Sequence, residues 1–316
     1  MAARIKKTRI RRRRFLEVLL IEWVPEKDDN TSRQAWQGTG RECGTLCGMQ
    51  WIYLSPHLDD VALSCGGLVK EQSLAGEEVQ VWTICAGDPP AQAVSGSAKS
   101  LSRFAESLHH RWQIDQEPGD LRRREDIASC QAMGATHRHF TLPDCIYRLG
   151  PANTPQAGLP LYTSEESLWQ PPHEAENGLL SELTQELRRA FPGGCQVVCP
   201  LTLGGHVDHR LTRQAAEAAS SCLWYYADFP YALKAQKELD DLRQAGWQET
   251  VFAISEAGLQ GWILSIAAHR SQISTFWHQD PGRRIPAFDL MKESVRRFCE
   301  SQGGVRLWQP PQKEPG

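Results

Sequence analysis

The sequence has no run of 18 or more apolar residues, so it predicts no membrane-spanning helix. It also lacks the G-x-G-x-x-G and G-x-x-x-x-G-K-[ST] patterns, and no nucleotide cofactor is expected. None of its ten cysteines forms the C-x-x-C pair that is typical of structural zinc and redox sites. Because they are scattered singly along a long chain, we expect them to be small buried residues in a reducing, cytoplasmic protein.

Positive charge is concentrated at one end of the chain, and acidic residues outnumber basic ones in the remainder. Residues 1–14 hold eight Lys or Arg and no acid, whereas the whole chain has a net charge of −3. Without those eight charges the remainder stands at about −11, which does not favour binding to nucleic acid. Residues 1–48 are expected to be a disordered basic tail or an over-extended start, with a nucleic-acid-binding arm as the alternative. The folded domain is then predicted at residues 49–310, followed by a tail at 311–316.

From Met49 onward, strand-like apolar segments alternate with amphipathic helical segments. We expect strands at residues 50–55, 79–85, 136–141, 195–200 and 223–226, and an edge strand at 305–308. We expect helices at residues 61–75, 101–113, 119–133, 179–191, 207–220, 256–276 and 288–301. This alternation predicts an α/β fold with a doubly wound, mostly parallel sheet and helices on both faces. The stretch 143–177 is rich in Pro and Gly, and an excursion of that size is usually functional.

Two clusters of histidine and aspartate follow two of these strands. The sequence Ser-Pro-His-Leu-Asp-Asp occupies residues 55–60, and His-Val-Asp-His occupies residues 206–209. The carboxyl ends of parallel strands form the ligand-binding edge of such a sheet. We therefore expect His57, Asp60 and His209 to hold one zinc, or another divalent ion in its place, with a coordination position left for water. Taken singly, each cluster could equally be a helix cap or a surface pair.

The other polar residues of the two clusters are assigned catalytic roles. Asp59, beside the ligand Asp60, is free to take a proton from the metal-bound water. His206 lies one turn before His209 and is expected to stabilise the oxyanion or to protonate the leaving amine. Asp208 could accept a hydrogen bond from a ring nitrogen of His206 and hold that ring charged.

The two clusters, with their flanking residues 61–67 and 200–205, resemble the motifs of the zinc-dependent N-acetylglucosaminyl deacetylases, the PIG-L or LmbE-like family. Weaker similarity covers residues 122–126, 226–231 and 271–272. The resemblance implies a Rossmann-like fold, a zinc held by the three expected ligands, Asp59 as base and His206 at the oxyanion. It also implies that zinc-bound water removes an N-acetyl group from a GlcNAc-type amino-sugar conjugate.

The resemblance further implies an arginine that contacts the sugar at the start of the third predicted helix. Arg122, Arg123 and Arg124 are the candidates, and we choose Arg122 for its spacing to Glu125. Asp144 is a candidate acceptor for a sugar hydroxyl, the alternative being a turn cap. The chain departs from the family at Gly204, where some members have a tyrosine, so any help from that tyrosine is absent or supplied elsewhere.

Two other functions remain open at this point. A zinc amidohydrolase acting on another amide would use the same ligands, and a non-catalytic sugar-binding module could retain the same fold. The expected partner is a small-molecule or glycoconjugate amino sugar, not nucleic acid. Neither the group that carries the sugar nor the oligomeric state follows from the sequence.

Overall fold

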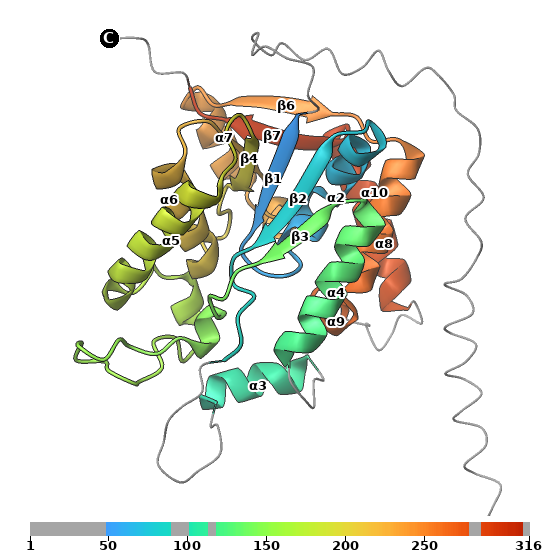
Figure 1. Cartoon of the computed structure of the whole chain (residues 1–316). Helices are drawn as coiled ribbons and strands as arrows, with labels where there is room; N and C mark the ends of the chain where they lie inside the picture. Colours follow the sequence, from blue (N-terminus) through green and yellow to red (C-terminus); the bar gives the residue numbers. More distant parts are fainter. Residues whose placement is uncertain (1–48, 90–100, 113–117, 278–285, 312–316) are drawn as a thin grey trace, which may run out of the picture. The chain divides into compact units, whose positions relative to one another are not determined.

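The computed structural model describes residues 49–89, 101–112, 118–277 and 286–311, and its centre is one sheet (Figure 1). The strands are β1 (Gln50–Ser55), β2 (Glu78–Thr83), β3 (Thr136–His139), β4 (Gln196–Pro200), β5 (Leu223–Tyr226), β6 (Gln248–Phe252) and β7 (Val305–Gln309). Their order across the sheet is β3-β2-β1-β4-β5-β7-β6. The first five strands in this order pair in parallel, and β7 pairs antiparallel with both β5 and β6.

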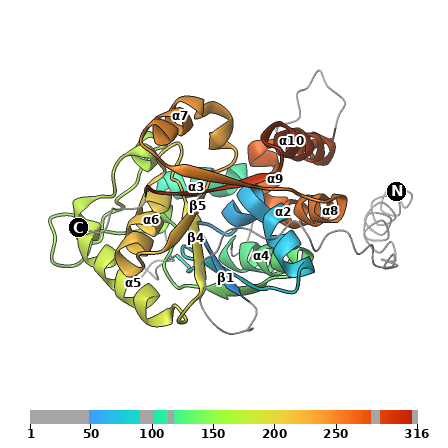
Figure 2. The same cartoon turned by 90° about the horizontal axis from the view of Figure 1, so that it is seen from above.

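Helices cover both faces of this sheet, as the α/β alternation of the sequence predicts. The longer helices are α2 (Asp60–Leu74), α3 (Arg103–Arg111), α4 (Pro118–Met133), α5 (Asn177–Ala190), α6 (Val207–Ala219), α7 (Gln236–Gln244), α8 (Glu256–Ala268), α9 (Arg270–Phe276) and α10 (Ala287–Gln302). Helices α2, α4 and α8 pack together on one face, and α5 packs with α6 on the other (Figures 1 and 2). The predicted doubly wound, mostly parallel sheet is therefore confirmed.

The core forms because the central strands β1 and β4 are apolar on both faces of the sheet, whereas β3 at its edge has no buried residue. Ile52 and Leu54 of β1 and Val197 of β4 are fully or almost fully buried. They belong to a cluster that also contains Leu187 of α5 and Leu211 of α6. A strand that is covered on both faces has a continuous run of apolar residues, and this run predicts β1 from the sequence.

Helix α2 is fixed against α8 by a close approach of its backbone to the Trp262 side chain. Gly66 and Gly67 lie where α2 meets Trp262, and a Cβ on Gly67 would lie only 2.7 Å from the Trp262 ring. The Trp262 indole N–H donates to the carbonyl oxygen of Ala62 at 2.7 Å. Because Asp60 is the first residue of α2, this contact also fixes the position of Asp60.

The sheet differs from the prediction at its far edge. The strand expected at 305–308 forms, but it lies between β5 and β6 and is not an edge. Strand β6 and helix α7 were not predicted. The helix expected at 256–276 is two helices, α8 and α9, with His269 between them.

The excursion at 143–177 contains only short 3-10 turns: η2 (Cys145–Tyr147), η3 (Glu166–Trp169) and η4 (Glu174–Glu176). A further turn, η5 (Tyr231–Lys234), follows β5. The predicted tails lie outside the described residues, apart from Pro311. None of the described helices is long and apolar enough to cross a membrane.

Candidate active site

The two predicted clusters meet at the carboxyl edge of the sheet. His57 follows β1, Asp60 begins α2, and His209 lies in the first turn of α6 beside β4. The oxygen Oδ2 of Asp60 lies 3.2 Å from His57 Nδ1 and 3.3 Å from His209 Nε2. His57 and His209 are 152 positions apart in the sequence. They lie close together because β1 and β4 are parallel neighbours. The structure thus brings the three expected metal ligands together.

A carboxylate lies beside each of the two histidines that are expected to bind the metal. Asp208 Oδ2 lies 2.9 Å from His57 Nε2, and Asp228 Oδ1 lies 2.6 Å from His209 Nδ1. When either ring is neutral, a carboxylate in this position accepts its N–H, and the lone pair of the opposite nitrogen is then directed towards Asp60. This is the usual arrangement behind histidines that bind a metal, because it fixes the tautomer and the ring orientation.

The charges around Asp60 affect the proton affinity of all three groups. Burial lowers the pKa of His209, but the Asp60 and Asp228 carboxylates outweigh burial and raise it to about 9. Burial likewise lowers the pKa of His57, and Asp144, Asp208 and Asp60 together raise it well above its usual value. Burial would raise the pKa of Asp60, yet His209 and His57 hold it well below its usual range. Strongly shifted pKa values of this kind cluster at functional sites.

Asp59 and Arg122 lie on the other side of Asp60. The Arg122 guanidinium lies 3.5 Å from Asp59 Oδ1 and 3.7 Å from Asp144 Oδ2. Burial raises the pKa of Asp59, and Arg122 only partly offsets this effect. Arg123, by contrast, pairs with Asp88 at 3.0 Å at the surface. Of the candidate arginines, the structure therefore places Arg122 at the site, beside both Asp59 and Asp144.

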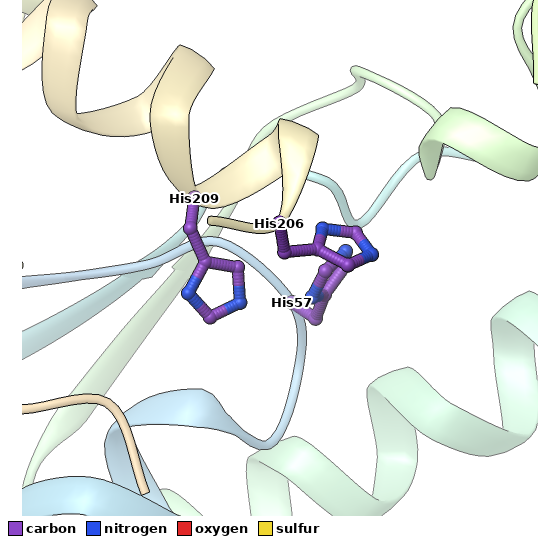
Figure 3. Close-up of side chains that lie close together, drawn as sticks. All are labelled: His57, His206 and His209. Atoms are coloured by element: carbon purple, nitrogen blue, oxygen red, sulfur yellow. The ribbon is translucent and has the colours of Figure 1, made fainter. Parts of the chain in front are cut away.

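His206 lies next to the ligand rings and caps α6 (Figure 3). Its ring centroid is 4.9 Å from that of His57 and 5.4 Å from that of His209. Its Nδ1 accepts from the backbone N–H of Asp208 at 3.3 Å. Burial and the neighbouring His57 lower the pKa of His206 to about 3. The ring is thus neutral, and its hydrogen is on Nε2.

The role expected for Asp208 is corrected by these contacts. Its carboxylate accepts from His57, from Arg148 Nη1 at 2.5 Å and from the backbone N–H of Cys145 at 3.0 Å. With both oxygens engaged in this way, Asp208 orients His57 and does not hold His206 charged. The sequence could not predict this because Arg148 is 60 residues away from Asp208 and no motif marks it.

Two aromatic rings form one wall of the site. Trp169 lies 5.3 Å from the His206 ring and 5.6 Å from Tyr231, and Tyr231 lies 6.1 Å from the His209 ring. Tyr231 also packs against Gly204, where a Cβ would lie 3.1 Å from its ring. The space in front of the glycine at position 204 is therefore filled by a tyrosine from another segment.

Three groupings of the described residues have donor atoms that all lie within 4.8 Å of one another, and none of the three contains Asp60. The groupings are His57 with His206 and His209, Cys145 with His206 and Asp208, and His57 with Asp144 and Asp208. Asp208 is already engaged by Arg148, and His206 Nδ1 is engaged by a backbone N–H. Asp60 Oδ2 faces two ring nitrogens and also accepts the backbone N–H of His57 at 2.7 Å, and Asp60 stays the third ligand that we propose.

The family model described as GlcNAc-PI de-N-acetylase, PIG-L, matches residues 52–220. That range contains both clusters and more than half of the chain. The protein is a member of the PIG-L family. The resemblance seen in the two motifs is thereby confirmed.

Two curated relatives of this PIG-L protein are 2′-N-acetylparomamine deacetylases. The one from Streptomyces fradiae is 30% identical over 186 residues, which cover 57% of either chain. The one from Niallia circulans is 24% identical over 227 residues, covering 63% of this chain and 72% of the relative. This chain therefore matches little more than half the length of the Streptomyces fradiae protein.

Solved structures of deacetylases share the fold. The zinc-inhibited form of the teicoplanin deacetylase Orf2 superposes with a TM-score of 0.63 at 23% identity, covering 85% of this PIG-L protein and all of Orf2. The A40926 pseudoaglycone deacetylase Dbv21 gives a TM-score of 0.57 at 24% identity, covering 82% of this chain and 96% of that one. At these identities the likeness shows the shared architecture.

Three residues at the site were not assigned a role from the sequence, namely Asp228, Arg148 and Tyr231, whereas Trp169 was a candidate for lining a sugar site. Asp228 had a usable signal, because it follows β5 and the end of that strand must lie at the same edge as β1 and β4. The excursion containing Arg148 and Trp169 was expected to be functional, but its irregular backbone gave no means of placing either side chain.

Proposed function

We propose that this PIG-L protein is a zinc-dependent hydrolase that removes an N-acetyl group from an amino-sugar conjugate. The observation that carries the proposal is the convergence of His57, Asp60 and His209, with Asp59 beside them. Two curated relatives are named as deacetylases of an N-acetylated aminoglycoside, which supports the same reaction class.

The donor set fits zinc. One oxygen of Asp60 lies 3.2 Å from a nitrogen of His57 and 3.3 Å from a nitrogen of His209, and each imidazole has a buried carboxylate beside it. His57, Asp60 and His209 would hold the ion. When bound there, a zinc ion supplies a Lewis acid for the acyl oxygen and lowers the pKa of a water ligand towards 7.

The residues of the chain do the remaining work. Asp59 takes the proton of the attacking water, and its raised pKa makes it a better base near neutral pH than an ordinary aspartate. The Nε2–H of His206 donates a hydrogen bond to the acyl oxygen as that oxygen gains negative charge. Arg122 and Asp144, which lie beside Asp59, bind sugar hydroxyls and orient the amide.

Tyr231 supplies a second hydrogen-bond donor in this proposal. It packs against Gly204, where some family members have a tyrosine. Burial, and then the Asp60 and Asp59 carboxylates, raise the pKa of Tyr231, so its hydroxyl stays protonated. Tyr231→Phe should lower kcat by about tenfold to a hundredfold with little change in KM, because the donor acts in the transition state. A change confined to KM would assign Tyr231 to substrate binding.

The decisive experiment measures acetate release by the purified full chain. The substrates would be 2′-N-acetylparomamine, a GlcNAc-inositol phospholipid, N-acetylated teicoplanin and a simple N-acetyl amino acid amide. Metal-free protein would be titrated with zinc up to one equivalent, since a solved relative has a zinc-inhibited form. We expect release from at least one amino sugar, rising linearly with zinc and abolished by a chelator.

Each rival function has its own outcome in this assay. Acetate release from the amino acid amide alone would identify an amidohydrolase of another class. Sugar binding that is unaffected by the chelator, with no acetate released, would identify a non-catalytic binding module.

A further inference from the structure

A buried chain of charged side chains joins the excursion 143–177 to His57. From His57 the contacts run through Asp208 to Arg148, whose Nη1 donates to Asp208 Oδ1 at 2.5 Å. Arg148 Nε donates to Glu176 Oε1 at 2.5 Å, and the Tyr162 hydroxyl donates to Glu176 Oε2 at 2.5 Å. Arg148, Glu176 and Asp208 are all at most 5% exposed.

The two oxygens of Asp208 have different partners. Oδ1 accepts from Arg148, while Oδ2 accepts from His57 and from the Cys145 backbone. A carboxylate is rigid and planar, so a guanidinium that fixes Oδ1 also fixes the direction in which Oδ2 points. Arg148 thereby sets the position of the acceptor that orients His57.

Arg148 is held independently of Asp208. Glu176 binds it from one side, the carbonyl oxygen of Pro143 accepts from Nη1 at 3.4 Å, and the Tyr162 ring lies 5.4 Å from its Cζ. These four residues all belong to the excursion. The chain of contacts therefore begins in the excursion, which holds Arg148 in place, and it ends at His57.

We propose that Arg148 is a positioning residue for the metal ligand His57, acting through Asp208, so that the excursion helps to set the metal affinity of the site. The inference rests on the metal site of the proposed function. It adds that residues 143–177 are part of the support of the metal centre.

The test is a double-mutant cycle read out as zinc affinity. Arg148→Met, Asp208→Asn and the double variant are made in the full chain, and the zinc Kd of each metal-free protein is measured by competition with a chromophoric chelator. Loss of such a supporting residue typically weakens metal binding 10- to 100-fold, and we expect this for Arg148→Met. If Arg148 acts through Asp208, the double variant loses less than the product of the two single losses.

Arg243→Met is the matched control. Arg243 also lies between two acidic groups, Asp240 at 2.7 Å and Glu249 at 3.1 Å, and 5.1 Å from the Trp308 ring. Its removal should leave the zinc Kd unchanged. Thermal unfolding of each metal-free variant separates a loss of fold from a loss of affinity.

Unchanged zinc affinity in a folded Arg148→Met protein would overturn the inference, as would two single losses that simply multiply. If Arg148→Met fails to fold, Glu176→Gln is the second variant, because it removes the charged partner of Arg148 and keeps the guanidinium. We expect Glu176→Gln to weaken zinc binding several-fold. Unchanged zinc binding in Glu176→Gln would also overturn the inference. A wild-type protein that binds zinc but releases no acetate would refute the proposed function and leave this inference standing.

Discussion

Asp59 and Asp60 are adjacent in the chain, but their surroundings give them opposite proton affinities. Asp60 faces two imidazoles, which hold its pKa well below the usual range. Asp59 is buried with one arginine at 3.5 Å, and burial raises its pKa. Two neighbouring carboxylates can thus divide the tasks of ligand and base, because environment and not residue type decides the role.

Asp59→Asn should therefore separate catalysis from metal binding. We expect kcat to fall by about 10²- to 10⁴-fold, since the general base is lost, while bound zinc stays close to one equivalent. Asp60→Asn is the comparison, and it should lose zinc. Equal loss of zinc in both variants, measured by atomic emission, would show that ligand and base have been exchanged.

The ligand role of His209 is tested in the same way. His209→Ala removes the ring between Asp60 and Asp228, and we expect both bound zinc and acetate release to be lost. His137→Ala on β3 is the control, because His137 is exposed on a strand remote from the two clusters. Stoichiometric zinc in purified His209→Ala would mean that the second cluster does not hold the metal.

At the scale of elements, the central strands β1 and β4 were predicted from continuous apolar runs, and β3 was predicted although its residues are polar. Strand β6 has the sequence Gln-Glu-Thr-Val-Phe and no fully buried residue, so it gives almost no periodic signal. Helix α7 buries only Leu239. The break between α8 and α9 occurs at His269 without a proline or glycine to mark it. Each miss is an element whose formation depends on tertiary contacts more than on local pattern.

The same limit applies to the site. Strand ends that share an edge could be predicted to meet, and the two clusters do meet. The partner of Asp208 could not be predicted, because a lone arginine in an irregular segment gives no indication of where its side chain lies.

The contact between α2 and α8 is tested by a pair of glycine substitutions. Gly67→Ala places a methyl group 2.7 Å from the buried Trp262 ring, and we expect it to lower the free energy of unfolding by about 1–3 kcal/mol. Gly178→Ala on α5 meets no atom within 4 Å and should be neutral or raise stability by up to about 1 kcal/mol. Urea unfolding measures both, and equal effects would contradict this packing.

At the scale of the whole molecule, the residues proposed for function all lie between His57 and Tyr231. The family match likewise begins at residue 52. Our expectation that residues 1–48 are a tail or an over-extended start leads to a direct prediction. A chain starting at Met49 should keep its zinc affinity and acetate release within about twofold of the full chain.

A marked loss of activity in the shortened chain would instead assign the first 48 residues a role in catalysis or folding. Retained acetate release with a loss of binding to nucleic acid would favour the alternative of a basic arm. Acetate release and nucleic-acid binding can both be measured on the full chain and on the shortened chain.

Just beyond Arg148, backbone hydrogen bonds join the two ends of a loop within the excursion. The backbone N–H of Gly150 donates to Leu159 at 2.9 Å, and that of Leu161 donates back to Arg148 at 3.0 Å. Most residues between 151 and 159 are exposed. Residues 151–159 thus form a loop whose base is held by its own backbone hydrogen bonds. Other loop sequences could be grafted between these hydrogen bonds to change substrate choice, while Arg148 and Glu176, which we propose to support the metal, stay in place.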